Sequence, residues 1–87
     1  MKIWKYKLVE GEVLELPLVE ILDVQIQHGE FVMWAVVSNN KHRISKVDCK
    51  FFMTGQEIDL DTLRHYDHKA TLQDDMGMVW HVFIRVD

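Results

Sequence analysis

The stretch ILDVQIQHGEFVMWAVV, residues 21–37, decides the fold of this chain. Its first half alternates apolar Leu22, Val24 and Ile26 with polar residues, the period of two that is typical of a β-strand with one buried face. His28-Gly29 then predicts a tight turn, and residues 31–37 are apolar on both faces, which indicates a central strand. The stretch therefore predicts a β-hairpin whose second strand lies inside a sheet.

The same alternation continues on both sides of this hairpin. Further strands are predicted at 4–8, 13–16, 44–53, 69–73 and 78–86, with turn residues between them and Pro17 ending the second. Asp59 is a good N-cap for the one plausible helix, at 59–66. We expect a single domain over residues 1–87 that is mainly β: a compact antiparallel β-sandwich or small barrel of six to seven strands with at most one short helix.

Composition and charge exclude several classes of protein. No apolar segment of signal-peptide length follows Met1, and the longest apolar run, 31–37, is too short to cross a bilayer. The formal charge of −4 does not suit sequence-independent nucleic-acid binding, which depends on clustered Lys and Arg. Cys49 is the only cysteine, and its alternation with neighbouring apolar residues predicts an inert position in the core. We therefore expect no membrane and no nucleic acid among the partners.

The motifs of catalysis are missing from the sequence. It contains no G-x-S-x-G elbow and no glycine-rich phosphate loop, and its 14 carboxylates are scattered over turns and strand ends. His65 and His68 would face the same way on a helix and could hold a metal with a carboxylate, but a polar loop explains them better. We expect a protein that is not an enzyme and that has no cofactor and no metal.

The residues that best suit ligand binding are aromatic and polar side chains on strands. His81 lies mid-strand between Trp80 and Val82, where we expect a half-buried ring that is bonded to a neighbour or, alternatively, contacts a ligand. Trp34 and Trp80, like the other aromatic residues, belong either to the core or to a stacking platform for bases. Gln25 and Gln27 would give such a site a polar lining. These five residues, Trp34, Trp80, His81, Gln25 and Gln27, are the candidate ligand-binding residues.

The pattern as a whole resembles a small family of functionally uncharacterised phage and prophage proteins. The matching residues are Trp4-Lys5-Tyr6, Leu16-Pro17, Ile21-Leu22, Val24-Gln25, Gln27, Gly29, Trp34-Ala35, Val37, Thr54-Gly55, Tyr66, Thr71, Gln73 and Val79-Trp80-His81-Val82-Phe83. They follow one another along nearly the whole chain. The resemblance implies a phage or prophage setting and action in the cytoplasm of the bacterial host.

Three functions fit these observations. The first is a non-enzymatic phage accessory protein with a counter-defence role, which binds and sequesters a nucleotide-type immune signalling molecule as an oligomer. The second is a phage protein that inhibits a host defence protein by direct protein–protein binding, and the third is a minor structural or assembly protein. A thin core and open sheet edges favour a homo-oligomer in each case, with a dimer as the default.

Overall fold

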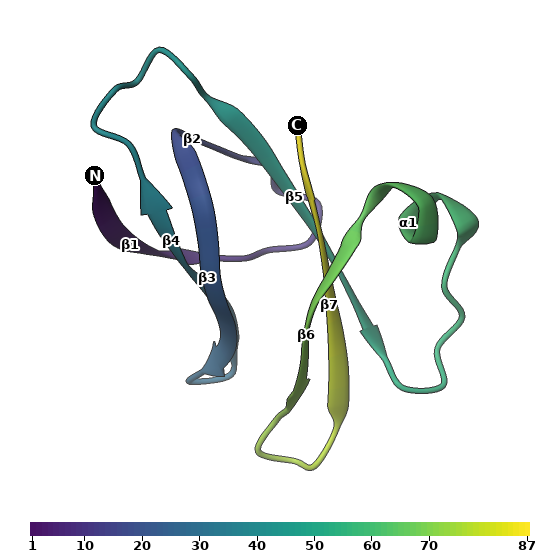
Figure 1. Cartoon of the computed structure of the whole chain (residues 1–87). Coiled ribbons are helices and arrows are strands. Elements are labelled where there is room, and N and C mark those ends of the chain that lie inside the picture. Colours follow the sequence, from purple (N-terminus) through teal and green to yellow (C-terminus); the bar gives the residue numbers. More distant parts are fainter.

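The computed structural model describes residues 1–87 and confirms a mainly β architecture with one short helix (Figure 1). The elements, in chain order, are β1 (Lys2–Lys7), β2 (Leu14–Leu16), β3 (Leu18–Gln27), β4 (Glu30–Val37), β5 (Ser45–Met53), α1 (Leu60–His65), β6 (Asp67–Gln73) and β7 (Val79–Val86). No helix is long and apolar enough to cross a membrane.

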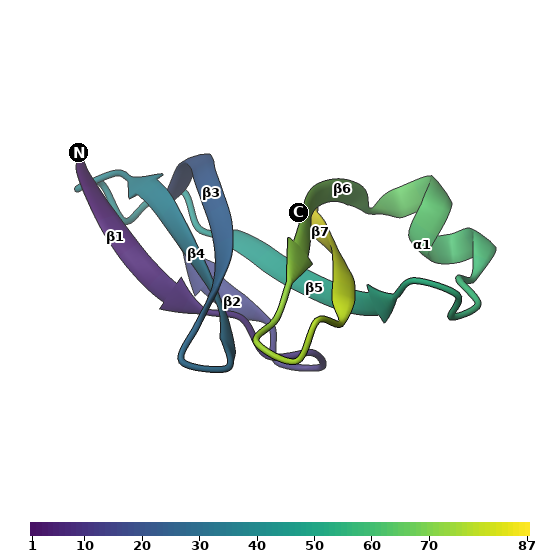
Figure 2. The same ribbon diagram turned by 90° about the horizontal axis from the view of Figure 1, so that it is seen from below.

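The strands form two antiparallel sheets. Sheet A has the order β1-β4-β3, and sheet B has the order β2-β5-β7-β6. Figure 2 shows β5 running from beneath sheet A to the far end of the molecule, where α1 lies. We call the side of each sheet that faces the shared core its inner face and the opposite side its outer face.

The hairpin of residues 21–37 forms as predicted. β4 lies between β1 and β3, and Gln27 pairs with Glu30 across a two-residue turn. His28 and Gly29 both have positive φ, 52° and 77°, which a two-residue hairpin turn needs in order to match the twist of its strands. The turn fixes the pairing register from Gln27–Glu30 as far as Asp23–Trp34.

Pro17 forms a corner between the two sheets. β2 ends at Leu16 in sheet B and β3 begins at Leu18 in sheet A, so the chain changes sheets at the proline. Proline has no N–H for a sheet ladder. Its carbonyl is satisfied by the N–H of Ser38, at 2.8 Å, which ties the corner to the end of β4.

Two irregularities in β3 correct the predicted faces of that strand. The pairing register with β4 shifts between Leu18 and Glu20 and again between Ile21 and Asp23, so that one extra residue is inserted at each place. Leu22 was expected on the buried face with Val24 and is instead 46% exposed, whereas Ile21 packs against the core. A bulge reverses the alternation, and the period of two does not reveal it.

The core is thin, as the chain length predicts. The molecule measures 41 × 30 × 18 Å, and 13 of its 87 residues are buried. Met33 and Ala35 of sheet A meet Val82 and Ile84 of sheet B at its centre, all with at most 1% exposure. Cys49 belongs to this core, as expected, and burial raises the pKa of its thiol to about 12.

Helix α1 is anchored to β5 by polar side chains. Asp59 caps the helix by accepting the hydroxyl proton of Thr62 at 2.7 Å and its backbone N–H at 3.1 Å, and these bonds, the hydroxyl bond foremost, lower the pKa of the Asp59 carboxyl. Lys50 of β5 donates to the hydroxyl of Thr62, and Tyr66 donates its phenolic proton to Asp48. This bond raises the pKa of Tyr66 to about 12.

Candidate functional site

Three shallow concavities mark the surface, and none of them is enclosed. One lies between the β3–β4 and β6–β7 turns with a volume of about 360 Å³, and one lies between α1 and sheet B with about 270 Å³. The third, also about 360 Å³, lies where β1, the Pro17 corner and the β4–β5 loop meet.

The structure does not bring the five predicted residues together. Trp34, Gln25 and Gln27 occupy the outer face of sheet A. Trp80 pairs with Leu72 and Met53 and lies on the inner face of sheet B, and His81 lies on the outer face of the same sheet. The five therefore contribute to three separate surfaces, and a single site cannot use all of them.

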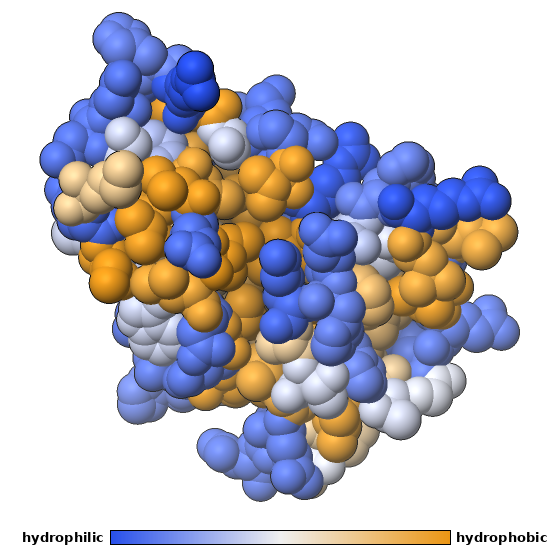
Figure 3. Space-filling view, viewed as in Figure 1, coloured by the Kyte–Doolittle hydropathy of each residue, from blue (hydrophilic) through white to orange (hydrophobic).

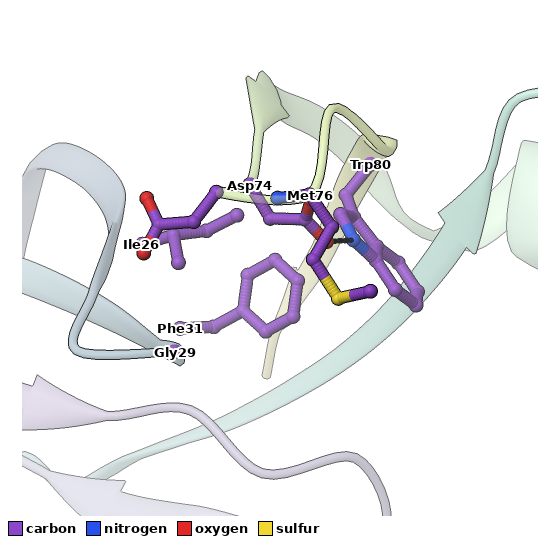
Figure 4. Close-up of a pocket in the computed structure, with 7 residues that line it drawn as sticks. Ile26, Gly29, Phe31, Asp74, Met76 and Trp80 are labelled. Atoms are coloured by element: carbon purple, nitrogen blue, oxygen red, sulfur yellow. Dashed lines mark hydrogen bonds between the residues drawn. The ribbon is translucent and has the colours of Figure 1, made fainter.

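Trp80 supports the β6–β7 turn, and Figure 4 shows it at the edge of the first concavity. Its indole N–H donates to Asp74 at 3.0 Å, and its ring meets that of Phe31 edge-on, with centroids 5.6 Å apart. Asp74 also accepts the backbone N–H groups of Met76 and Met78, and these bonds, the one from Trp80 foremost, lower the pKa of its carboxyl. With Asp74 and Asp75 in its lining, this concavity would repel an anion.

His81 has hydrogen-bond partners at both ring nitrogens. Nε2 lies 2.9 Å from the hydroxyl of Thr54, and Nδ1 lies 3.2 Å from that of Thr71. The Thr71 hydroxyl in turn lies 3.0 Å from Nε2 of His68, so four side chains form one chain of hydrogen bonds on the outer face of sheet B. The expected half-buried, bonded histidine is confirmed, and neither nitrogen is left over for a ligand.

The other two histidines of interest do not form a metal site. His65 ends helix α1 and lies 3.7 Å from Asp61, whereas His68 belongs to β6 and bonds to Thr71. No group of three or more His, Cys, Asp or Glu side chains is arranged to hold a metal ion.

The third concavity combines an exposed indole and a partly buried tyrosine with lysines, and we call it the Trp4 groove. One wall is the inner face of β1, with Trp4 and Tyr6. Trp4 pairs with Ala35, whose small side chain leaves the indole uncovered, and Trp4 is 54% exposed. The remaining lining residues are Lys2, Glu15, Leu16, Pro17, Val37, Ser38, Lys41 and Ile44.

The charges in the Trp4 groove favour an anion. Nζ of Lys2 lies 5.2 Å from the centroid of the Trp4 ring, a cation–π distance. Lys2 and Lys41 make no ion pair with a carboxylate of the chain, and Glu15 is the only acidic residue in the lining. An exposed indole beside two unpaired ammonium groups suits a flat ring that carries negative charge.

The sequence gives an incomplete signal for this groove. Lys2, Trp4 and Tyr6 follow the period of two and so share one face of a strand, which could have drawn attention to them. Lys41 lies in a loop, and the sequence of a loop does not show which strand it lies against. The groove exists because the Pro17 corner and this loop fold back towards β1, and no local pattern records that contact.

Comparison with known proteins gives one match. A protein-family model, described as a domain of unknown function (DUF7352), matches residues 1–87. No curated protein and no solved structure matches the chain.

Proposed function

Since the chain belongs to the DUF7352 family, a family of unknown function, over residues 1–87, we propose its function from its surface: it binds a planar, anionic small molecule of the nucleotide type in the Trp4 groove. The observation that carries the proposal is the 54% exposed indole of Trp4 beside Lys2 and Lys41 in a concave site. The proposed ligand class is the one that the sequence predicts. The proposed site is the Trp4 groove, which contains none of the five candidate residues predicted from the sequence.

The proposed binding energy has two sources. Stacking of a base on an aromatic side chain contributes about 1–3 kcal/mol. Lys2 and Lys41 supply ammonium groups for phosphate, and such contacts weaken as salt screens them. A groove of about 360 Å³ lies within the range of small-molecule sites, at its lower end. We therefore expect micromolar affinity for one nucleotide unit.

The groups in the groove support binding without turnover. Ser38 is the one hydroxyl nucleophile of the lining besides the phenol of Tyr6, and its Oγ accepts the N–H of Asn40 at 3.0 Å. No histidine lines the groove, and Glu15, its one carboxylate, makes no hydrogen bond with Ser38 that would let it act as a general base there. We propose a non-enzymatic protein.

The biological setting of the proposal rests on the resemblance to phage and prophage proteins. A phage accessory protein that holds a nucleotide-type immune signal in the host cytoplasm would lower the free concentration of that signal. Such sequestration needs sufficient affinity for the signal and enough copies of the protein to bind it, and it needs no catalysis. We propose this counter-defence role as the function of the Trp4 groove.

The test is a binding measurement with defined nucleotides and matched variants. Calorimetry with mononucleotides, dinucleotides and cyclic dinucleotides would give the affinity of each. We expect Trp4→Ala to weaken binding at least tenfold, because it removes the stacking surface, and Lys41→Gln to weaken it and reduce its salt dependence. The controls are Trp34→Ala and Lys69→Gln, which change the same residue types outside the groove and should bind normally.

Native mass spectrometry after incubation with a small-molecule filtrate of phage-infected bacteria extends the test to natural ligands. An added mass that the Trp4→Ala variant does not acquire would support the proposal. Equal loss of binding in Trp4→Ala and Trp34→Ala, or no binding of any nucleotide, would contradict it. A nucleotide returned in chemically altered form would identify an enzyme, and a stable complex with a host protein in place of a small molecule would favour the inhibitor hypothesis.

A further inference from the structure

The outer face of sheet A carries an ordered array of side chains, of which nine form three rows of three. Its central column comes from β4 and is apolar: Val32 is buried between its neighbours, with 5% exposure, and Trp34 and Val36 are partly buried. Each of these pairs with one residue of β1 and one of β3, which gives the rows Ile3–Val36–Glu20, Lys5–Trp34–Asp23 and Lys7–Val32–Gln25. An apolar strip therefore runs between two columns of different charge.

Apolar side chains widen this strip at both edges. Ile3 of β1 is 60% exposed, and the two residues at the register shifts of β3, Val19 and Leu22, are 51% and 46% exposed. Figure 3 shows hydrophobic surface gathered over β3 and β4 on the side turned to the viewer. Large exposed side chains placed next to one another on a small monomer mark an interaction surface.

The charges on either side of the strip are complementary to each other. The β1 column carries Lys5 and Lys7, and the β3 column carries Glu20 and Asp23. Lys5 donates only to the neutral amide of Gln27, and Asp23 accepts only from neutral N–H groups, so neither has an ionic partner within the chain.

A twofold axis along β4 would pair these charges. Rotation about an axis in the plane of the face and parallel to β4 places the β1 column of one copy over the β3 column of the other. Each row stays level, so Lys5 of one copy faces Asp23 of the other, twice per dimer, and Trp34 meets its symmetry mate on the axis. A twofold contact requires this kind of self-complementarity.

We infer that the chain forms a homodimer by stacking the outer faces of sheet A. Three strands about 4.8 Å apart, with six paired residues at a rise of about 3.4 Å, give a patch of roughly 300 Å² in plan. This patch, with its flanking side chains, is small beside the roughly 800 Å² per partner of a standard interface. The dimer is therefore a weak one, with a dissociation constant in the micromolar range.

The dimer and the Trp4 groove are compatible and independent. Trp4 and Tyr6 alternate along β1 with Ile3 and Lys5, so they lie on the inner face of sheet A and stay uncovered when the outer faces stack. Dimerisation is a property beyond the proposed ligand binding. A variant that no longer dimerises can still be tested for nucleotide binding, and a variant that no longer binds nucleotide can still be tested for dimerisation.

The experiment reverses the charge of Lys5 in one variant and of Asp23 in another, and then mixes the two variants. Sedimentation velocity from 1 to 500 µM should show a monomer–dimer equilibrium for the wild type. Lys5→Glu and Asp23→Lys should each weaken self-association at least tenfold, because each places like charges opposite each other in both contacts. An equimolar mixture of the two variants should restore a dimer, since both contacts of the mixed pair join opposite charges.

Native mass spectrometry of that mixture separates the outcomes. Mixed dimers in excess over either single-variant dimer would establish the stacked arrangement. Self-association that neither substitution changes would place the contact elsewhere and overturn the inference, as would a wild-type monomer at 500 µM, which would leave the face to a partner of another kind. Circular dichroism of each variant checks that the fold is intact.

Discussion

The bulge at Leu22 predicts that two single-residue deletions in the same strand have opposite outcomes. Without Leu22, Ile21 and Asp23 become consecutive and pair with Ala35 and Trp34, so every other residue keeps its partner and its face. Leu22 is 46% exposed, and its removal takes little apolar surface out of the core. We expect a change in the free energy of unfolding within about 1 kcal/mol.

After deletion of Gln25, no register lets all the remaining residues of β3 keep both their partners and their faces. With the turn held in place, Val24 moves from opposite Met33 to the outer face, and Asp23 takes its position in the core. Val24 is 3% exposed, so the lost burial costs about 1.5–3 kcal/mol, and burying an unpaired carboxyl adds several more. If the turn slips instead, Ile26 leaves the core and Gln27 enters it. A loss of about 4 kcal/mol or more is expected, against a total stability of roughly 4–13 kcal/mol for a domain of this length.

Urea unfolding followed by tryptophan fluorescence and circular dichroism measures both deletions. A loss of about 4 kcal/mol corresponds to a midpoint shift of roughly 1–4 M urea, or to no folded baseline at all. The wild type and the Leu22 deletion should have midpoints close to each other. Similar losses in the two deletions would refute the assigned register and the bulge.

Three further predictions concern the turns and the core. His28→Asn should stabilise the protein by about 0.5 kcal/mol, because asparagine adopts the positive φ of that position more readily than histidine, and a lower urea midpoint would contradict the turn geometry. Cys49 should resist a thiol reagent at pH 8 until the chain unfolds: a pKa of about 12 leaves roughly one thiol in ten thousand ionised, whereas about a quarter is ionised at an ordinary pKa of 8.5, and rapid labelling of the native protein would refute the buried position. The lowered pKa of Asp74 stabilises the fold at pH values above the ordinary carboxyl pKa, and this contribution is lost as the pH falls through the lowered value. Between pH 6 and pH 2 the wild type should therefore lose more stability than Asp74→Asn, and parallel pH profiles would contradict the hydrogen bonds drawn to this carboxylate.

Most of the fold could be predicted from the sequence because local patterns specify it. The alternation of apolar and polar residues predicts most of the strands, and the continuous apolar run at 31–37 predicts β4. β3 begins at Leu18, earlier than the predicted start at Ile21. The capping Asp59 predicts the helix within one residue at each end. Cys49 was assigned to the core from its neighbours alone. What the patterns miss are the two register shifts in β3 and the one between His68 and Ala70 in β6, since a single inserted residue leaves no recognisable mark in the alternation.

The site could be predicted only in its chemistry. Aromatic and basic side chains on strands predict a stacking site. The candidate ligand-binding residues, such as Trp34 and His81, nevertheless lie on the outer faces of different sheets. The sequence shows which residues share a face of one strand and does not show which strands adjoin. The Trp4 groove depends on contacts between residues 2–6, 15–17 and 37–44, and only the three-dimensional structure brings these segments together.

The position of β7 determines when the chain can fold during its synthesis. β7 is translated after β5 and β6, yet it lies between them in sheet B, and it supplies Val82 and Ile84 to the centre of the core. Until Val86 has left the ribosome, β5 and β6 lack their common partner, and Val82 and Ile84 are not yet in place in the core. A chain terminated before Val79 would lack the strand that joins the two sides of sheet B.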